Sequence, residues 1–460
     1  MKYIVLIATA LLAGCGSDDD STTIPYNFQL KALTAACESG GEGGEGADCD
    51  IEPWIIDNQG NIKQITDLNP NGSSIPSFSE NEFNGKYYFA ASDSVHGREL
   101  WSLDTSDNSV SMVKDIEEGA DSSGPGNFFV YNESLYFSAT QGDFRSALWK
   151  TDGTSDGTVL VFDPRTSNGS ASVGNFVELN NKLFFTAYGD VDDQHVGLEW
   201  WVSDGSTEGT SLLTELVTGS DGSGINETIV WKNKIFFEAT DGNNTPSDTE
   251  HSYSLFVSDG SANGTILLKD INPTEVASSE ARIDSFTDLG ERLIFTARDG
   301  VYGSELWVTD GTTEGTQLVK DITEGASSST IRSFKVLDNT AYFLAYNGDS
   351  RTSSLWRTDG TSDGTTNIMD FDNATDLEVI DAGIIVSATL GESSGLWLSD
   401  GTEQGTQLFY QDSDIGWLND NLNPIVYFYK NNELWYTDGS TEGTKLAVDE
   451  EGRSISSIDI

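Results

Sequence analysis

The stretch SELWVTDGTTEGTQLVKDI, residues 304–322, decides the fold because near-copies of it recur along the chain. In seven of the nine copies a glycine-rich DGT or DGS turn separates two apolar segments, and an aromatic residue marks the first of them. Eight of the eleven tryptophans occupy this marked position. The aromatic residues recur at intervals of 38 to 55 residues, and they are Trp54, Trp101, Trp149, Trp201, Phe256, Trp307, Trp356, Trp397 and Trp435. The chain is therefore one unit repeated nine times.

A second pattern precedes each copy and consists of two short apolar segments joined by a polar pair. In NFVELNNKLFFTA, residues 175–187, the pair is Asn-Asn, and NG or DN takes its place in other copies. Segments rich in β-branched and aromatic residues that are joined by such pairs are typical of hairpins. No segment has the 3.6-residue period of a helix. Each unit is therefore predicted to hold four antiparallel strands.

Four-stranded units that recur at this spacing predict an all-β fold, a β-propeller whose blades cover one another. One sheet of about 50 residues cannot bury a core by itself; an open solenoid is the main alternative. The segment RSISSIDI, residues 453–460, follows the last motif, and the first segment, residues 28–36, lacks an innermost partner. We expect the C-terminal strand to close the ring, which removes two open sheet edges. Residues 26–460 would form a single propeller domain of nine repeat units, with nine blades or eight.

The N-terminus has the features of an export signal. Lys2 precedes an apolar stretch of ten residues, 4–13, which is too short to span a bilayer. The stretch ends in Leu12-Ala13-Gly14-Cys15, which resembles the bacterial lipobox. The resemblance implies that residues 1–14 are a lipoprotein signal peptide and that Cys15 carries acyl chains, which anchor it in a membrane. Gly16-Ser17, rather than an Asp, follows Cys15; by resemblance to Gram-negative lipoproteins, this implies sorting to the outer membrane. Residues 15–25 are expected to form a flexible tether.

Two further cysteines, Cys37 and Cys49, flank a loop rich in Gly and Glu. Export would place them in an oxidising compartment, where a disulfide is the expected state. A disulfide that closes a loop of this size would contribute about 3 kcal/mol in the chain-entropy description.

The repeated motif resembles that of the bacterial ELWxxDGT-repeat proteins, a group of exported proteins. The resemblance covers about residues 50–450. It implies an exported repeat protein but no particular activity.

The net charge of the chain limits the classes of partner that it can bind. It has 75 acidic and 24 basic side chains and a formal net charge of −51. This charge would repel the phosphates of nucleic acids and of anionic lipids. Cations, neutral glycans and basic protein surfaces remain suitable partners.

The Asp of each DGT turn has two interpretations. An Asp side chain can accept backbone N–H groups within a turn, and Gly tolerates positive φ. The motif can therefore be a structural requirement of the hairpin turn that recurs with each unit. Alternatively, these oxygens could bind calcium, the one cofactor that the pattern suggests. The seven residues are Asp152, Asp204, Asp259, Asp310, Asp359, Asp400 and Asp438.

Alternating strands place the DGT turns on one face of the ring and the loops before each ELW motif on the other. These loops vary in length and sequence, and variable loops on a rigid scaffold are common binding sites. The candidate ligand-face residues are His96, Arg98, His195, His251, Arg298 and Arg351. The connectors between units each begin with an Asp, and rotational repetition could arrange these as a metal-binding ring made of Asp67, Asp115, Asp163, Asp270 and Asp321.

No catalytic set stands out: the chain lacks HExxH and a P-loop. We therefore expect a lipid-anchored outer-membrane propeller that acts as a binding or interaction scaffold for a glycan or protein, facing the cell surface or the periplasm. A cell-surface propeller enzyme acting on polysaccharide is one alternative. A periplasmic scaffold for outer-membrane assembly is another.

Overall fold

The computed structural model describes residues 28–35, 52–57, 59–70, 74, 76–79, 82–142, 146–165, 170–240, 253–272, 282–348, 350–431, 433–449, 452 and 454–456. The predicted signal peptide and tether, with Cys15, lie outside these ranges. So do Cys37, Cys49 and His251. The described ranges contain β-strands and no α-helix, as the apolar pattern predicts. They accordingly include no helical segment with the length and hydropathy needed to cross a bilayer.

The predicted hairpin turns are confirmed by the backbone. The φ angles are +53° at Asn180 and +57° at Asn181, and they are +49° at Asp338 and +60° at Asn339. Two successive residues with positive φ form the two-residue turn that suits the twist of a hairpin, and Asn, Asp and Gly adopt it at least cost. In these units the polar pairs therefore set the register of the first two strands.

Seven sheets have four antiparallel strands each, connected in sequence order. The first three sheets are β4 (Ser77–Phe78), β5 (Lys86–Ala91), β6 (Glu99–Asp104), β7 (Val110–Lys114); β8 (Gly126–Tyr131), β9 (Ser134–Thr140), β10 (Ser146–Thr151), β11 (Val159–Phe162); and β12 (Gly174–Leu179), β13 (Lys182–Val191), β14 (Gln194–Ser203), β15 (Ser211–Thr214). The next two are β16 (Asn226–Trp231), β17 (Lys234–Thr240), β18 (Tyr253–Ser258), β19 (Ile266–Lys269); and β20 (Ile283–Asp288), β21 (Leu293–Arg298), β22 (Ser304–Thr309), β23 (Gln317–Lys320). The last two are β24 (Ile331–Leu337), β25 (Thr340–Asn347), β26 (Thr352–Thr358), β27 (Thr366–Phe371); and β28 (Asn373–Ile380), β29 (Gly383–Leu390), β30 (Ser393–Ser399), β31 (Gln407–Gln411).

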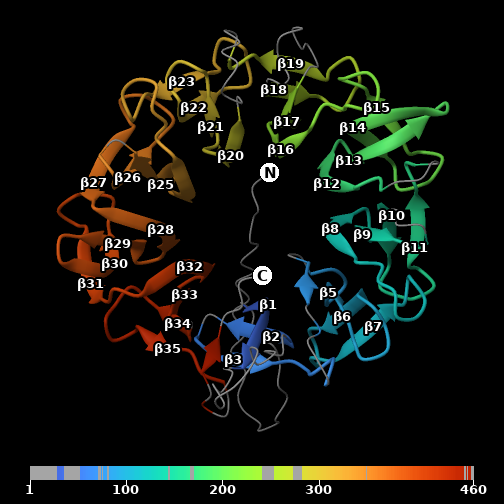
Figure 1. The fold of residues 1–460 in the computed structure, drawn as a ribbon, viewed down its shortest axis with the longest axis horizontal. Coiled ribbons are helices and arrows are strands. Elements are labelled where there is room, and N and C mark those ends of the chain that lie inside the picture. Colours follow the sequence, from blue (N-terminus) through green and yellow to red (C-terminus); the bar gives the residue numbers. More distant parts are fainter. Residues whose placement is uncertain are drawn as a thin grey trace, which may run out of the picture.

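The two ends of the chain share one eight-stranded sheet. Its N-terminal part is β1 (Phe28–Ala35), β2 (Glu52–Asp57) and β3 (Ile62–Gln64), and its C-terminal part is β32 (Ile415–Leu422), β33 (Ile425–Lys430), β34 (Glu433–Thr437), β35 (Lys445–Leu446) and β36 (Ile455–Ser456). The short strand β36 lies between β1 and β34 and pairs antiparallel with both. The sheets follow one another around a ring with their first strands toward the middle, which is a propeller-like arrangement (Figure 1).

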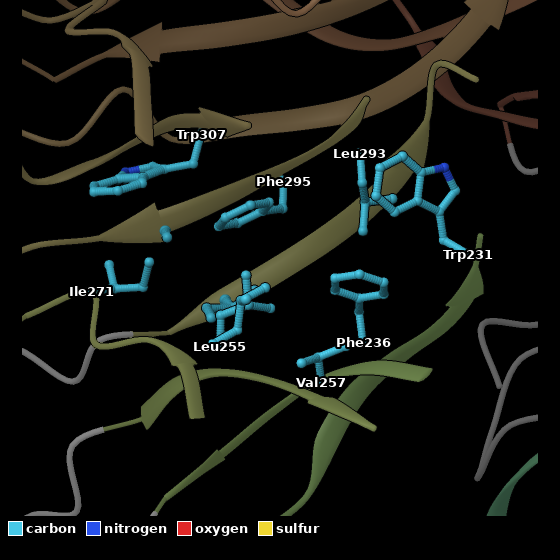
Figure 2. Close-up of a cluster of buried hydrophobic side chains, with 11 residues drawn as sticks. Trp231, Phe236, Leu255, Val257, Ile271, Leu293, Phe295 and Trp307 are labelled. Atoms are coloured by element: carbon cyan, nitrogen blue, oxygen red, sulfur yellow. The ribbon is translucent and has the colours of Figure 1, made fainter. Parts of the chain in front are cut away.

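The core lies between neighbouring sheets. On β17, Phe236 belongs to the cluster shared with β20–β23, whereas Phe237 belongs to the cluster on the other side. Figure 2 shows the first cluster, in which Phe236 lies near Trp231 and Phe295 near Trp307. Both faces of each central strand are buried in this way, because successive side chains of a strand point to opposite faces. The motif aromatic is a core residue, since Trp307 is 6% exposed and Phe256 is 3% exposed.

Candidate functional site

The ring has two chemically different faces. Because the strands of a sheet run up and down in order, the turn between strands one and two and the DGT turn lie at one edge; we call this the DGT face. The loop between strands two and three and the connector to the next sheet lie at the other edge, the variable-loop face. Backbone hydrogen bonds tie the connector to this edge of the sheet: Gly97 N–H, in the loop before β6, donates to Gly119 O at 3.1 Å, and Gly197 N–H, near the start of β14, donates to Gly219 O at 2.9 Å.

The carboxylates of the DGT turns hold their own turns together. Asp310 Oδ1 accepts the backbone N–H of Thr312 at 2.8 Å and its hydroxyl at 2.7 Å. The hydroxyl bond to Thr312 is the main reason that the pKa of Asp310 lies below its ordinary value. Thr309 and Thr316 close the base of the turn with a hydroxyl pair at 2.7 Å. In the other six DGT or DGS turns the Asp Oδ1 also accepts the N–H of the residue two positions later. This supports the interpretation that the Asp stabilises the hairpin turn.

The two glycines of this turn are needed for different reasons. Gly311 has φ +94°, a conformation that L side chains rarely adopt. At Gly315 the need is space, because an added Cβ would lie 2.1 Å from Asp310 Oδ1.

Sequence reasoning missed the role of the ELW glutamates, Glu99, Glu199 and Glu305. All three are 0% exposed. The Glu305 carboxylate accepts the N–H of Ile322 at 2.9 Å and the hydroxyl of Ser329 at 2.5 Å. Each glutamate thus holds the connector that leads to the next sheet. Equivalent bonds come from Ile116 and Ser123 to Glu99, and from Val217 and Ser223 to Glu199.

Burial raises the pKa of Glu199 and of Glu305 to about 7, although the hydroxyl and N–H donors oppose this shift. A signal for this arrangement exists in the sequence: a Ser follows each ELW glutamate after 24 residues. In the copy where Ala147 replaces the glutamate, Ala171 replaces the Ser, and both are buried. In this unit the two positions change together, which avoids an unpaired buried polar group.

A further buried acid, Glu238, departs from the repeat. Other units place Ser138, Thr186 or Thr296 at this position of the second strand. The Glu238 carboxylate is 0% exposed and accepts the N–H of Ile283 at 2.8 Å, and burial raises its pKa to about 7.

The connector aspartates also support local turns. Asp115 Oδ2 accepts Gly119 N–H at 3.1 Å, and Asp321 Oδ2 accepts Gly325 N–H at 3.0 Å. Oδ1 of Asp163 and of Asp270 each accept the N–H two residues later, and Asp67 is exposed. Within the described ranges no three His, Cys, Asp or Glu side chains are grouped as metal ligands. The structure does not bring these aspartates together, and calcium binding stays a prediction.

The two described histidines lie on the variable-loop face but on different sheets. The Nδ1 of His96 contacts Asp93 Oδ2 at 2.9 Å, and this bond raises the pKa of the imidazole. On the extended hairpin of β13 and β14, His195 Nδ1 contacts Asp190 Oδ1 at 2.5 Å. Another sheet, β8–β11, separates the two histidines (Figure 1).

The three candidate arginines differ in exposure. Arg98 is half-buried, which lowers its pKa, and its N–H donates to Ser122 Oγ at 2.8 Å. Arg298 is half-buried as well, whereas Arg351 is exposed in a turn with φ +59°.

Two loops of the variable-loop face share one preformed turn. Asp93 Oδ1 accepts the N–H groups of Val95 and His96 at 2.7 and 2.6 Å. In the other loop, Asp299 Oδ1 accepts the N–H groups of Val301 and Tyr302 at 2.8 and 2.7 Å. These turns present apolar side chains to solvent: Val95 is 66%, Val301 is 51% and Tyr302 is 40% exposed.

Comparison with known proteins finds no matching family model and no matching curated protein. Among solved structures, the chain is similar to one described in a study of two prolyl endopeptidases, with 10% identity and a TM-score of 0.45 over 84% of this chain and 51% of that one. It is also similar to oligopeptidase B from Leishmania major, with 8% identity and a TM-score of 0.41 over 90% and 66%. A nidogen/laminin complex matches with 8% identity and a TM-score of 0.29 over 61% and 95%. The chain spans about half the length of the first solved structures that it matches, and likenesses this distant carry no argument about function.

Proposed function

We propose that the protein is a lipid-anchored outer-membrane β-propeller that binds a protein partner through its variable-loop face. One observation carries this proposal: two loops with the same preformed turn expose Val95 beside His96 and Val301 beside Tyr302. Exposed apolar side chains on fixed loops are typical of interaction sites, because little conformational entropy is lost when they bind. The net charge of −51 favours a partner with a basic surface.

The proposed scaffold is a ring of nine blades. The pairing of β36 with β1 supports closure, because it gives the first sheet an innermost strand. The sheet then has the same four-strand order as its neighbours, β36–β1–β2–β3. A closed ring would hold the binding loops in fixed relative positions.

The interaction face can be tested by site-specific photocrosslinking in cells. A photoreactive amino acid at Val95 or Val301 is expected to give a discrete adduct with a partner. The same group at Glu314, an exposed residue of a DGT turn, is the control and should not give that adduct. Absence of an adduct at both valines, or the same adduct at Glu314, would contradict the proposal.

The anchor needs a separate test. Replacement of Cys15 by Ser should release the protein from the membrane fraction, since no thiol remains for acylation. Protein that stays membrane-bound after this change would show that the lipobox interpretation is wrong.

A further inference from the structure

A hollow of about 540 Å³ lies on the DGT face, at the inner turns of three consecutive sheets. The turn of β12–β13 contributes Asn180 and Asn181, and the turn of β16–β17 contributes Lys232 and Asn233. Asp288, at the end of β20, and Gly290, between β20 and β21, form the third wall. The volume is within the range of about 300–1,000 Å³ that small-molecule sites occupy.

The floor of this hollow departs from the repeat. Trp231 stands where the neighbouring sheets have Leu179 and Leu289. Its indole Nε1–H donates to Asp288 Oδ1 at 3.0 Å and to Gly290 O at 3.2 Å, so the ring is tied to the next sheet. Figure 2 shows Trp231 at one end of the shared core cluster. The larger ring is itself buried, with 3% of Trp231 exposed, and it belongs to the core cluster beneath the hollow.

A charged side chain covers the indole. The Lys232 ammonium lies 4.3 Å from the centre of the Trp231 ring. Lys232 Nζ also donates to the backbone carbonyl of Glu291 at 2.8 Å and pairs with the Glu291 carboxylate at 3.3 Å, although that side chain is 97% exposed. A ligand that contacts the face of the indole must therefore displace the Lys232 side chain.

The rim offers both donors and acceptors. Asn233 donates to Asn180 Oδ1 at 3.1 Å, which orients these two amides. Within the described part of the chain, the side-chain amide of Asn181 and the carboxylate of Glu178 make no hydrogen bond to protein. One planar amide and one carboxylate are thus available at the rim of the hollow.

We propose that this hollow binds a neutral saccharide. The amide of Asn181 can donate to one hydroxyl and accept from another, and the Glu178 carboxylate can accept from a third. When the Lys232 side chain is displaced, the face of the Trp231 indole beside Val230 can contact the C–H surface of a sugar ring. Glu178 and Asp288, with the charge of the whole chain, disfavour an anionic ligand. This site lies on the face opposite the proposed protein-binding loops, so it does not depend on that proposal.

The test uses the full chain with Cys15 replaced by Ser and a panel of neutral oligosaccharides of glucose, galactose, mannose and N-acetylglucosamine. A polyuronate is the charged comparison, and affinity is measured by titration calorimetry. At least one neutral oligosaccharide is expected to bind, and the polyuronate is not.

Two variants introduce the residue that another unit has at the equivalent position, and they are therefore expected to fold. Asn181→Gly reproduces the Asn84-Gly85 turn, and Trp231→Leu reproduces Leu179. Each should weaken binding by about tenfold or more. The matched control is Glu133→Gly, at the equivalent turn position outside the hollow. The proposal is overturned if no neutral saccharide binds, if the polyuronate binds more tightly, or if both folded variants keep the affinity of the parent.

Discussion

At the scale of single residues, the repeat depends on polar groups that are buried and paired. The ELW glutamate and the Ser 24 residues later satisfy each other across a connector, with Ser329 and Glu305 as the shortest pair. The unit with Ala147 and Ala171 shows that both groups can be absent together. The pair is therefore an interacting unit, in which loss of one member leaves the other without its partner.

This predicts strong coupling between Glu305 and Ser329. Glu305→Ala should lower the free energy of unfolding by about 1–3 kcal/mol, because the Ile322 N–H and the Ser329 hydroxyl lose their acceptor. The double variant with Ser329→Ala should cost less than the sum of the single variants. Denaturant titration measures all three, with the exposed Glu314→Ala as control. Additive effects would show that the two side chains do not interact.

The DGT turn gives a second prediction at this scale. Gly315→Ala places a Cβ against Asp310 Oδ1 and should lower the free energy of unfolding by about 1–3 kcal/mol. Gly348→Ala is the control, because a Cβ added there would meet no atom within 4 Å and its φ is not positive. Thermal melting compares the two variants. An equal midpoint for both would mean that the contact at Gly315 does not constrain the turn.

At the scale of elements, the short strand β36 has an effect larger than its length suggests. It bonds to β1 through Thr34–Ser456 and Ala35–Ile455, and to β34 through Glu433–Ser456. It thus covers two strand edges that would otherwise be open to solvent or to other chains.

A chain that ends at Gly452 should therefore melt at a lower temperature and associate more readily, because the edges of β1 and β34 are exposed. The control is a chain that ends at Ser456, which keeps β36. Differential scanning calorimetry and light scattering measure the two properties. If the chain ending at Gly452 matches the control in both, β36 does not close the ring.

At the scale of the whole molecule, two groups of acids make stability depend on pH in opposite directions. Glu199, Glu238 and Glu305 have pKa values raised to about 7 by burial, so the folded state binds more protons than the unfolded state between about pH 4.5 and 7. Their contribution is complete below the ordinary glutamate pKa and is lost as the pH rises through 7. Six DGT aspartates have lowered pKa values, and their contribution is lost as the pH falls below the ordinary aspartate value; they are Asp152, Asp204, Asp259, Asp310, Asp359 and Asp400.

The melting temperature should therefore be highest near pH 5. It should be lower than this maximum both at pH 8 and at pH 3. Glu305→Gln should reduce the difference between pH 5 and pH 8, because one of the three titrating groups is removed. Calorimetry at the three pH values measures this profile in constant salt. A midpoint that rises steadily from pH 5 to pH 8 would contradict the assignment of raised pKa values.

The sequence by itself determined the repeat, its four strands, the hairpin turns and the DGT turns. These features depend on hydrogen bonds and dihedral angles within about ten residues, as in the turn from Thr309 to Thr316. It also separated the uniform turns from the variable loops, since strand alternation follows from order along the chain. Neither the ELW glutamate contacts nor the hollow beside Trp231 was predicted. The tertiary structure decided both, because burial and the meeting of turns from three sheets depend on how the units pack around the ring.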